Sequence, residues 1–160
     1  MDILNRLLGH DEWTTTQLLG QCVTLSPAQW QQEFDVGQGS LCETFDHLVD
    51  NVEAWTDLML ERPVRNLKGN TPDQLLQRWQ AAYTEFASLA RALQDQGRFE
   101  DCYLDKLDNP AKQKTFGGTI LHIITHSHQH RAEAIHILNH LGLADVIEGD
   151  VLSWEQGNKP

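Results

Sequence analysis

The sequence is poor in basic residues and has no long apolar run, and each shortage excludes a class of protein. Its 160 residues include 12 Lys and Arg against 23 Asp and Glu, which gives a formal net charge of -11. Nucleic-acid binding needs clustered Lys and Arg that neutralise phosphates, so we expect no nucleic-acid partner. No apolar run approaches the roughly 18 residues of a membrane span, and the first residues lack the basic and apolar regions of a secretion signal. We therefore expect a cytoplasmic protein without a membrane partner, which acts on a small molecule or another protein.

Cysteine is scarce as well. Cys22, Cys42 and Cys102 are widely spaced and form no CxxC pair. An odd number at such spacing indicates reduced thiols in the core or at the surface, and neither a disulfide framework nor a cysteine metal site. The chain also lacks the HExxH motif of zinc proteases and the glycine-rich phosphate loops of Walker or Rossmann spacing. Neither of these site types is expected.

Helical periodicity dominates the sequence that is present, because apolar residues recur at intervals of three and four over separate stretches. A capping box at Ser40 and Glu43 predicts the start of the second stretch, and Pro72 at the first helical position predicts the start of the third. The predicted helices run from near the N-terminus to about Thr24, from Leu41 to about Leu60, from Pro72 to about Gly97, and from about Thr119 to Leu141.

The segments between these helices differ in length and character. Residues 31–39 are polar and predict a crossing loop, whereas the loop after the second helix is predicted to be short. Residues 98–116 are irregular, with an alternating stretch at 99–104 that suggests a short strand. We therefore predict that residues 1–160 form a single domain of the all-α class. It is a four-helix bundle with a long, partly irregular connection between helices 3 and 4 and a C-terminal tail that packs on the bundle.

The most informative stretch is a cluster of histidines on the predicted fourth helix, at positions 122, 126, 128 and 130. Imidazole is the commonest protein ligand for Zn, Ni, Cu and Fe, and ligands four residues apart lie one helical turn above each other. A helical projection places His130 inside the apolar arc and His126 at its edge, while His122 leans towards solvent. The inward pair is therefore His126 and His130. The histidines expected to be exposed polar residues are His10, His128, His136 and His140.

His47 is the candidate for a third ligand, because two imidazoles do not hold a divalent metal well. It lies at the edge of the apolar face of the second predicted helix, in a position much like that of His126. Three imidazoles would leave coordination positions open, as in a catalytic site. The alternative is that His47 simply faces solvent. One Glu-x-x-His motif of di-iron bundles runs from Glu133 to His136, but such a site needs two.

Three segments together resemble a known family over nearly the whole chain. They are LLGHDEW at 7–13, GSLCETFDH at 39–47 with Trp55 eight residues later, and LHIITHSHQHR at 121–131. They resemble the DinB-like (DinB/YfiT) superfamily of bacterial metal-binding four-helix bundles. Its pattern is a histidine on the second helix and HxxxH followed by Arg on the fourth. His47, His126 and His130 fall on these positions, so the resemblance implies that they are the metal ligands.

The chain also departs from the family pattern. Family members commonly have adjacent histidines and a glycine in the fourth-helix motif, where this chain has Gln129 before His130 and Ala132 after Arg131. His10 stands where an aromatic residue is usual. The ligand spacing is retained. The resemblance implies Zn or Ni as the metal and a homodimer as the assembly.

The resemblance also implies a function, because superfamily relatives include thiol-dependent transferases and isomerases. It implies a metal-dependent enzyme in which a low-molecular-weight thiol acts on a small electrophile. A divalent ion held by neutral imidazoles lowers the pKa of a bound thiol, or of a bound water in a hydrolase. His122 or Asn51 would line the pocket as proton carrier or hydrogen-bond donor. Arg131 would pair either with an anionic substrate group or with an acid inside the bundle.

Two other functions stay open at the level of sequence. The first is a stress-associated metal or ligand carrier without turnover. The second is a structural metal whose coordination shell is closed by a fourth protein ligand, for which Glu43 and Asp46 near His47 are the candidates.

Overall fold

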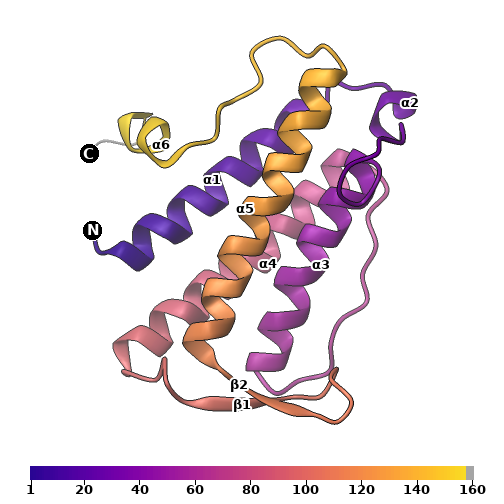
Figure 1. Ribbon diagram of the computed structural model, residues 1–160. Helices are drawn as coiled ribbons and strands as arrows, with labels where there is room; N and C mark the ends of the chain where they lie inside the picture. Colours follow the sequence, from indigo (N-terminus) through magenta and orange to yellow (C-terminus); the bar gives the residue numbers. More distant parts are fainter. Residues whose placement is uncertain (158–160) are drawn as a thin grey trace.

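Four long helices lie side by side in the computed structural model, which describes residues 1–157 (Figure 1). They are α1 (Ile3–Cys22), α3 (Leu41–Met59), α4 (Pro72–Asp95) and α5 (Phe116–His140), and the short elements are α2 (Pro27–Trp30), β1 (Cys102–Asp105), β2 (Lys112–Thr115) and α6 (Val151–Gly157). Both α1 and α3 pack mainly against α4 and α5. In the bundle, α1 therefore lies diagonally opposite α3, and α4 lies diagonally opposite α5. The predicted all-α bundle is confirmed.

The core lies between the four helices and is built from the apolar stripes that the sequence predicts. Trp79 and Tyr83 of α4 are fully buried with their ring centroids 4.5 Å apart, and Phe86 stacks edge-on against Tyr83. Burial of one large apolar side chain contributes roughly 1.5–3 kcal/mol, so these stripes are the main reason that the helices associate. None of the helices within residues 1–157 combines the length and hydropathy needed to cross a membrane.

Helices α3 and α4 run parallel, although they follow each other in the sequence. Arg78 of α4 donates a hydrogen bond to Asp50 of α3. Two turns further along both helices, Arg65 connects Glu85 of α4 with Asp57 of α3. The chain must therefore return along the whole bundle through residues 60–71, and Figure 1 shows this extended segment beside α3. Extended chain covers about 3.3 Å per residue against about 1.5 Å in a helix, so a short segment suffices. The predicted short loop is thus short in sequence but long in space.

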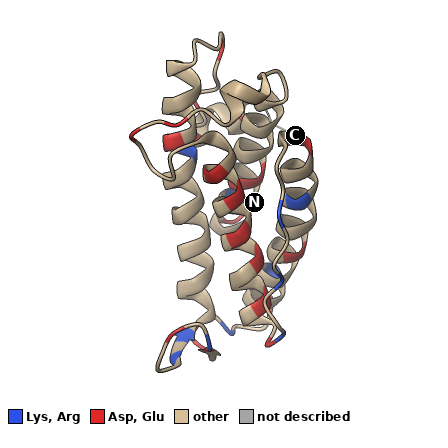
Figure 2. Ribbon diagram, turned by 90° about the vertical axis from the view of Figure 1, so that its right-hand side faces the viewer, with Lys and Arg blue, Asp and Glu red and all other residues tan. Residues whose placement is uncertain are grey.

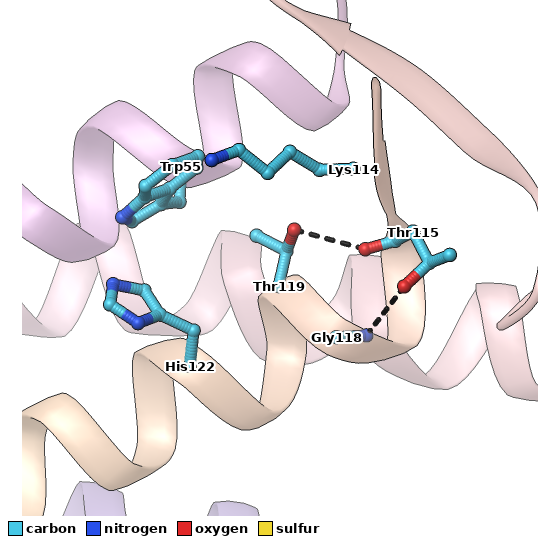
Figure 3. A pocket seen from close by; sticks show the side chains of 6 residues that line it. All are labelled: Trp55, Lys114, Thr115, Gly118, Thr119 and His122. Atoms are coloured by element: carbon cyan, nitrogen blue, oxygen red, sulfur yellow. Dashed lines mark hydrogen bonds between the residues drawn. The ribbon is translucent and has the colours of Figure 1, made fainter. Parts of the chain in front are cut away.

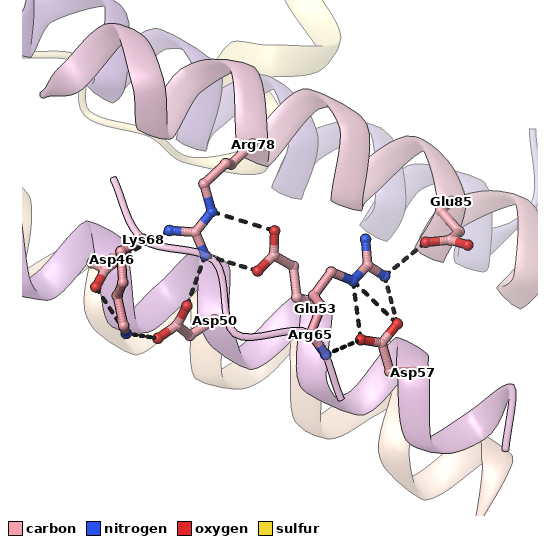
Figure 4. Close-up of polar contacts among 8 residues, drawn as sticks. All are labelled: Asp46, Asp50, Glu53, Asp57, Arg65, Lys68, Arg78 and Glu85. Atoms are coloured by element: carbon pink, nitrogen blue, oxygen red, sulfur yellow. Dashed lines mark hydrogen bonds and ion pairs between the residues drawn. The ribbon is translucent and has the colours of Figure 1, made fainter. Parts of the chain in front are cut away.

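Ion pairs fix this return segment to α3 (Figure 4). The fully buried carboxylate of Asp57 accepts hydrogen bonds from Arg62 Nε at 2.6 Å and from Arg65 Nη2 at 2.7 Å. Burial alone would raise the pKa of Asp57, but the hydrogen bonds from Arg65 and Arg62 outweigh it and lower that pKa. Farther along the segment, Lys68 Nζ lies 2.7 Å from Asp50.

A row of acidic residues along α3 supplies the partners for these cations. Figure 2, in which the side of the bundle that carries α3 faces the viewer, shows this row. Arg78 reaches from α4 to Asp46, Asp50 and Glu53, each at 2.7 Å. The acidic row therefore forms ion pairs with α4 and with the return segment, and this side of α3 is where those two segments pack.

The connection before α5 forms a small hairpin. β1 pairs with β2 in antiparallel register, with Cys102 opposite Thr115. The short strand suggested at 99–104 is present as β1, whereas β2 is not predicted. Thr115 caps α5 by accepting a hydrogen bond from Gly118 N at 3.1 Å. The helix consequently begins at Phe116 and not at the predicted Thr119, because the threonine cap lies before the glycine pair.

The C-terminal tail packs on α1 through α6. Trp154 lies against Gly9, where an added Cβ would collide with the indole ring. The tail also covers His10, whose Nε2 lies 2.7 Å from the carbonyl oxygen of Gly149. The expectation that His10 is exposed is therefore wrong, since only 8% of its surface is accessible. The cause is a tail contact that helical periodicity cannot reveal.

Candidate metal centre

Three imidazoles from two antiparallel helices converge on one point. His126 Nε2 lies 3.2 Å from His47 Nε2 and 3.2 Å from His130 Nε2. The ligand atoms of the three residues all lie within 4.8 Å of one another. The structure therefore brings together the three residues that the sequence nominates, 79 positions apart for His47 and His126.

The helix faces position these rings as the projection predicts. His130 is buried within the apolar arc of α5, whereas His126 and His47 are half-buried at the edges of α5 and α3. His126 and His130 are one turn apart, with ring centroids separated by 4.4 Å. His47 closes the group from the facing helix, with its ring centroid 4.8 Å from that of His130.

The geometry of the group fits a small divalent metal. Imidazole nitrogens bound to one tetrahedral ion at about 2.0–2.1 Å lie about 3.3 Å apart, close to the two separations of 3.2 Å. His126 Nδ1 is buried without a hydrogen-bond partner among the described residues. That nitrogen points away from the convergence point, so Nε2 is the atom that His126 offers to a ligand.

The electrostatic environment keeps the imidazoles of His126 and His47 neutral, as metal ligation requires. Burial, together with the neighbouring rings of His130 and His47, lowers the pKa of His126 to about 4. Burial and the charge of His130 likewise lower the pKa of His47. Near pH 7 both residues therefore present a lone pair on the ring nitrogen.

Glu133 orients His130 and is a residue that the sequence argument did not assign to the site. Its Oε2 lies 2.6 Å from His130 Nδ1, so the proton resides on that nitrogen and Nε2 faces the other histidines. Gly37, at φ +56°, lies so close to this carboxylate that a Cβ there would collide with it. The sequence spacing could have indicated this contact, because His130 and Glu133 are three residues apart and so share a helix face.

Replacing Glu133 with Gln is expected to lower metal affinity by about 10-fold to 100-fold, with the fold retained. The amide cannot match the carboxylate as a partner for the Nδ1 proton, so His130 loses both orientation and basicity. Isothermal titration of the metal-free protein with Zn²⁺ measures the effect. Glu43→Gln is the matched control, since it removes the same charge on the facing helix. Equal affinities for the Glu133→Gln protein and the wild type would show that this contact does not tune the site.

The two acids considered as a fourth ligand are engaged elsewhere. Glu43 accepts a hydrogen bond from Ser40 Oγ at 3.0 Å, and Asp46 forms ion pairs with Arg78 and Lys68. Within the described residues, the group contains no cysteine or carboxylate ligand. The arrangement therefore leaves coordination positions that the protein does not fill, which is typical of catalytic sites and not of closed structural ones.

The pocket candidates His122 and Asn51 lie on α5 and α3, the two helices that carry the histidine group. His122 lines a cavity of about 290 Å³, opposite Trp55 (Figure 3). Its ring centroid lies 5.3 Å from that of His126. Asn51 lies one turn from His47 on α3, and its Oδ1 is buried without a hydrogen-bond partner among the described residues.

Arg131 lies in the interface between α5 and α1. Its guanidinium forms an ion pair with Asp11, which is completely buried, and Nη1 lies 3.4 Å from Thr15 Oγ1. Only 2% of the Arg131 side chain is exposed. Of the two roles considered for Arg131, the structure displays the ion pair inside the bundle.

The lowered pKa of His126 predicts that the metal-free protein loses stability as the pH falls from about 6.5 to about 4. In this window the unfolded chain binds a proton that the folded His126 does not, so protonation favours unfolding. Below about pH 4 both states carry the proton, so the loss of stability due to His126 is complete and does not grow further. Urea unfolding of metal-free protein at several pH values measures the loss. His126→Gln should flatten this part of the profile, and an unchanged slope in that variant would assign the loss to other groups.

Comparison with known proteins supports the fold and shows the family. The family model described as DinB family matches residues 1–155. The structure is similar to a crystal structure of a DinB-like protein from Bacillus cereus ATCC 10987, with a TM-score of 0.61 and 17% sequence identity, covering 84% of this chain and 88% of that chain. At this identity the likeness shows the fold alone. No curated protein matches the chain.

Proposed function

Because the chain belongs to the DinB family, we propose that it is a metal-dependent enzyme in which a low-molecular-weight thiol reacts with a small electrophile. His47, His126 and His130 would hold one divalent ion, Zn²⁺ or Ni²⁺. The observation that carries the proposal is the convergence of three ring nitrogens in a group to which the described residues add no fourth ligand. Such a group leaves room for a substrate beside the ion.

The chemistry follows from the charge that the site would carry. A divalent ion in this group would supply a Lewis acid that lowers the pKa of a thiol or water in an open position. The three histidines would bind the ion, and Glu133 orients His130 by keeping its ring proton on Nδ1. His122 borders the site, and burial together with the charge of Lys114 lowers the pKa of His122. Its neutral ring can accept a proton that a thiol releases.

Thiol conjugation with and without metal tests the proposal. The metal-free protein is loaded with Zn²⁺ or Ni²⁺ and mixed with a low-molecular-weight thiol and a chromogenic aryl halide. We expect conjugation above the uncatalysed rate only with metal, and loss of this rate in His126→Ala. His128→Ala, on the exposed flank of the same helix, should retain it.

Other outcomes would favour the competing functions. Stoichiometric metal binding with no thiol-dependent or water-dependent turnover would indicate a carrier. Unfolding of the protein on chelation would indicate a structural metal. Equal conjugation rates in the presence and absence of metal would contradict the enzyme proposal.

A further inference from the structure

A row of side chains connects the three-histidine group to the cavity in Figure 3. The ring centroid of His126 lies 5.3 Å from that of His122, and the His122 centroid lies 5.4 Å from that of Trp55. Lys114 Nζ then lies over the Trp55 ring, 5.5 Å from its centroid. A continuous row of side-chain contacts therefore runs from the histidine group to a lysine ammonium on β2.

The cavity is small and combines aromatic, hydroxyl and cationic groups. It has a volume of about 290 Å³, near the lower end of the range for small-molecule sites. Its walls come from three elements, α3, β2 and α5. The lining residues are Trp55, Lys114, Thr115, Gly118, Thr119 and His122.

Lys114 is the only charged residue that lines this cavity within the described chain. Its ammonium lies 3.4 Å from Asp105 and 3.3 Å from Asp108, longer than good charged hydrogen bonds of about 2.7–2.9 Å. These acids hold the side chain in place, and the ammonium also faces the cavity across Trp55 (Figure 3). The N-terminus of α5 contributes a further partial positive charge.

Lys114 is itself shared with Asp105 and Asp108, and the molecule as a whole has a formal net charge of -11. The other cations near α3, Arg78, Arg65 and Lys68, are paired with the acidic row of that helix. Among the described residues that line the cavity, Lys114 is the one that can serve as counter-ion to an anionic group, and the flat face of Trp55 is an apolar wall for a ligand's carbon chain.

We propose that this cavity binds the carboxylate end of a small molecule whose other end reaches the three-histidine centre, with Lys114 as the counter-ion. The substrate class is then a small carboxylate-bearing thiol or electrophile. The inference rests on the proposed metal centre for the placement of the reacting end, whereas the affinity of the cavity for a carboxylate does not depend on a metal.

A series of ω-mercaptoalkanoates of increasing length, each paired with the matching ω-mercaptoalkanol, tests the inference. Binding to Co²⁺-loaded protein is followed by the thiolate-to-cobalt charge-transfer absorption band. At the chain length that spans the distance from Lys114 to the histidine group, we expect the carboxylate to bind about tenfold more tightly than the alcohol, as for a hydrogen bond to a charged group. Lys114→Met should abolish this preference, and Lys114→Arg should retain most of it.

Lys112→Met is the matched control, because Lys112 lies on the same strand, pairs with the same Asp108 and does not line the cavity. It should leave the preference unchanged. Equal binding of carboxylate and alcohol at every length, or a preference that survives Lys114→Met, would overturn the inference.

A second titration separates this inference from the proposed function. Metal-free protein labelled with ¹⁵N is titrated with hexanoate and, separately, with hexanol. We expect hexanoate alone to shift the amide of Gly118 and the indole N–H of Trp55, and only when Lys114 is present. Shifts of this kind without any thiol binding to the Co²⁺ protein would support the cavity and contradict the thiol reaction. The absence of such shifts would overturn the cavity assignment even if thiols bind.

Discussion

Replacing His126 with alanine is expected to reduce bound metal from about one equivalent to near zero, with an affinity loss of more than about 100-fold. The magnitude exceeds the 10-fold to 100-fold typical of residues that only support a ligand. His126 is the shared neighbour in the group, because its Nε2 lies 3.2 Å from that of each partner. Its removal leaves two imidazoles on different helices, which hold a divalent ion poorly.

Metal analysis after dialysis against equimolar Zn²⁺ measures this effect, and titration calorimetry gives the affinity. His47→Ala and His130→Ala should behave in the same way as His126→Ala. His128→Ala is the control on the exposed flank of α5 and should retain a full equivalent. Undiminished metal in all three of the site variants would refute the three-histidine centre.

Replacing Arg131 with methionine is expected to destabilise the fold by about 3–5 kcal/mol while leaving metal stoichiometry unchanged. The change leaves the Asp11 carboxylate buried without a counter-ion, because Asp11 has no exposed surface and has Arg131 as its ion-pair partner within residues 1–157. Urea unfolding of the metal-free protein gives the free energy. The double variant Asp11→Leu with Arg131→Met should recover most of the loss, since an apolar pair of similar volume needs no desolvation.

Arg98→Met is the control for this prediction, because Arg98 and Asp101 form an ion pair with both side chains about half exposed. Pairs of this kind contribute about 0.2–1 kcal/mol. A loss no larger than this in Arg131→Met, combined with weaker binding of carboxylate ligands, would instead support the substrate-binding role considered for Arg131.

Much of the candidate site followed from local periodicity. The positions of His126 and His130 on α5 follow from a rotation of about 100° per residue, and the burial of His130 and the partial burial of His126 agree with it. The coordination requirement of a metal then called for a ligand on another helix, and His47 occupied the equivalent edge of α3. The expected exposure of His128, His136 and His140 is also confirmed.

The parts that sequence reasoning missed involve contacts between segments that have no periodicity of their own. Lys114 lies in a connection that was predicted to be irregular, and only the pairing of β2 with β1 directs it towards Trp55. His10 was misplaced because the tail that buries it carries no helical signal over residues 143–150. The parallel course of α3 and α4 depends on the pairing of Asp57 with arginines of the return segment.

The amino-acid sequence by itself determined the helices, their inward faces and the histidines able to bind a metal, because each of these follows from short-range spacing along one helix. Only the tertiary structure decided which helices are neighbours, that Arg131 is committed to Asp11, and that Glu133 orients His130 beneath a loop. It also decided that a lysine-lined cavity adjoins the histidine group. These features depend on how separate elements pack, and packing energies between distant segments are not encoded in any single stretch of sequence.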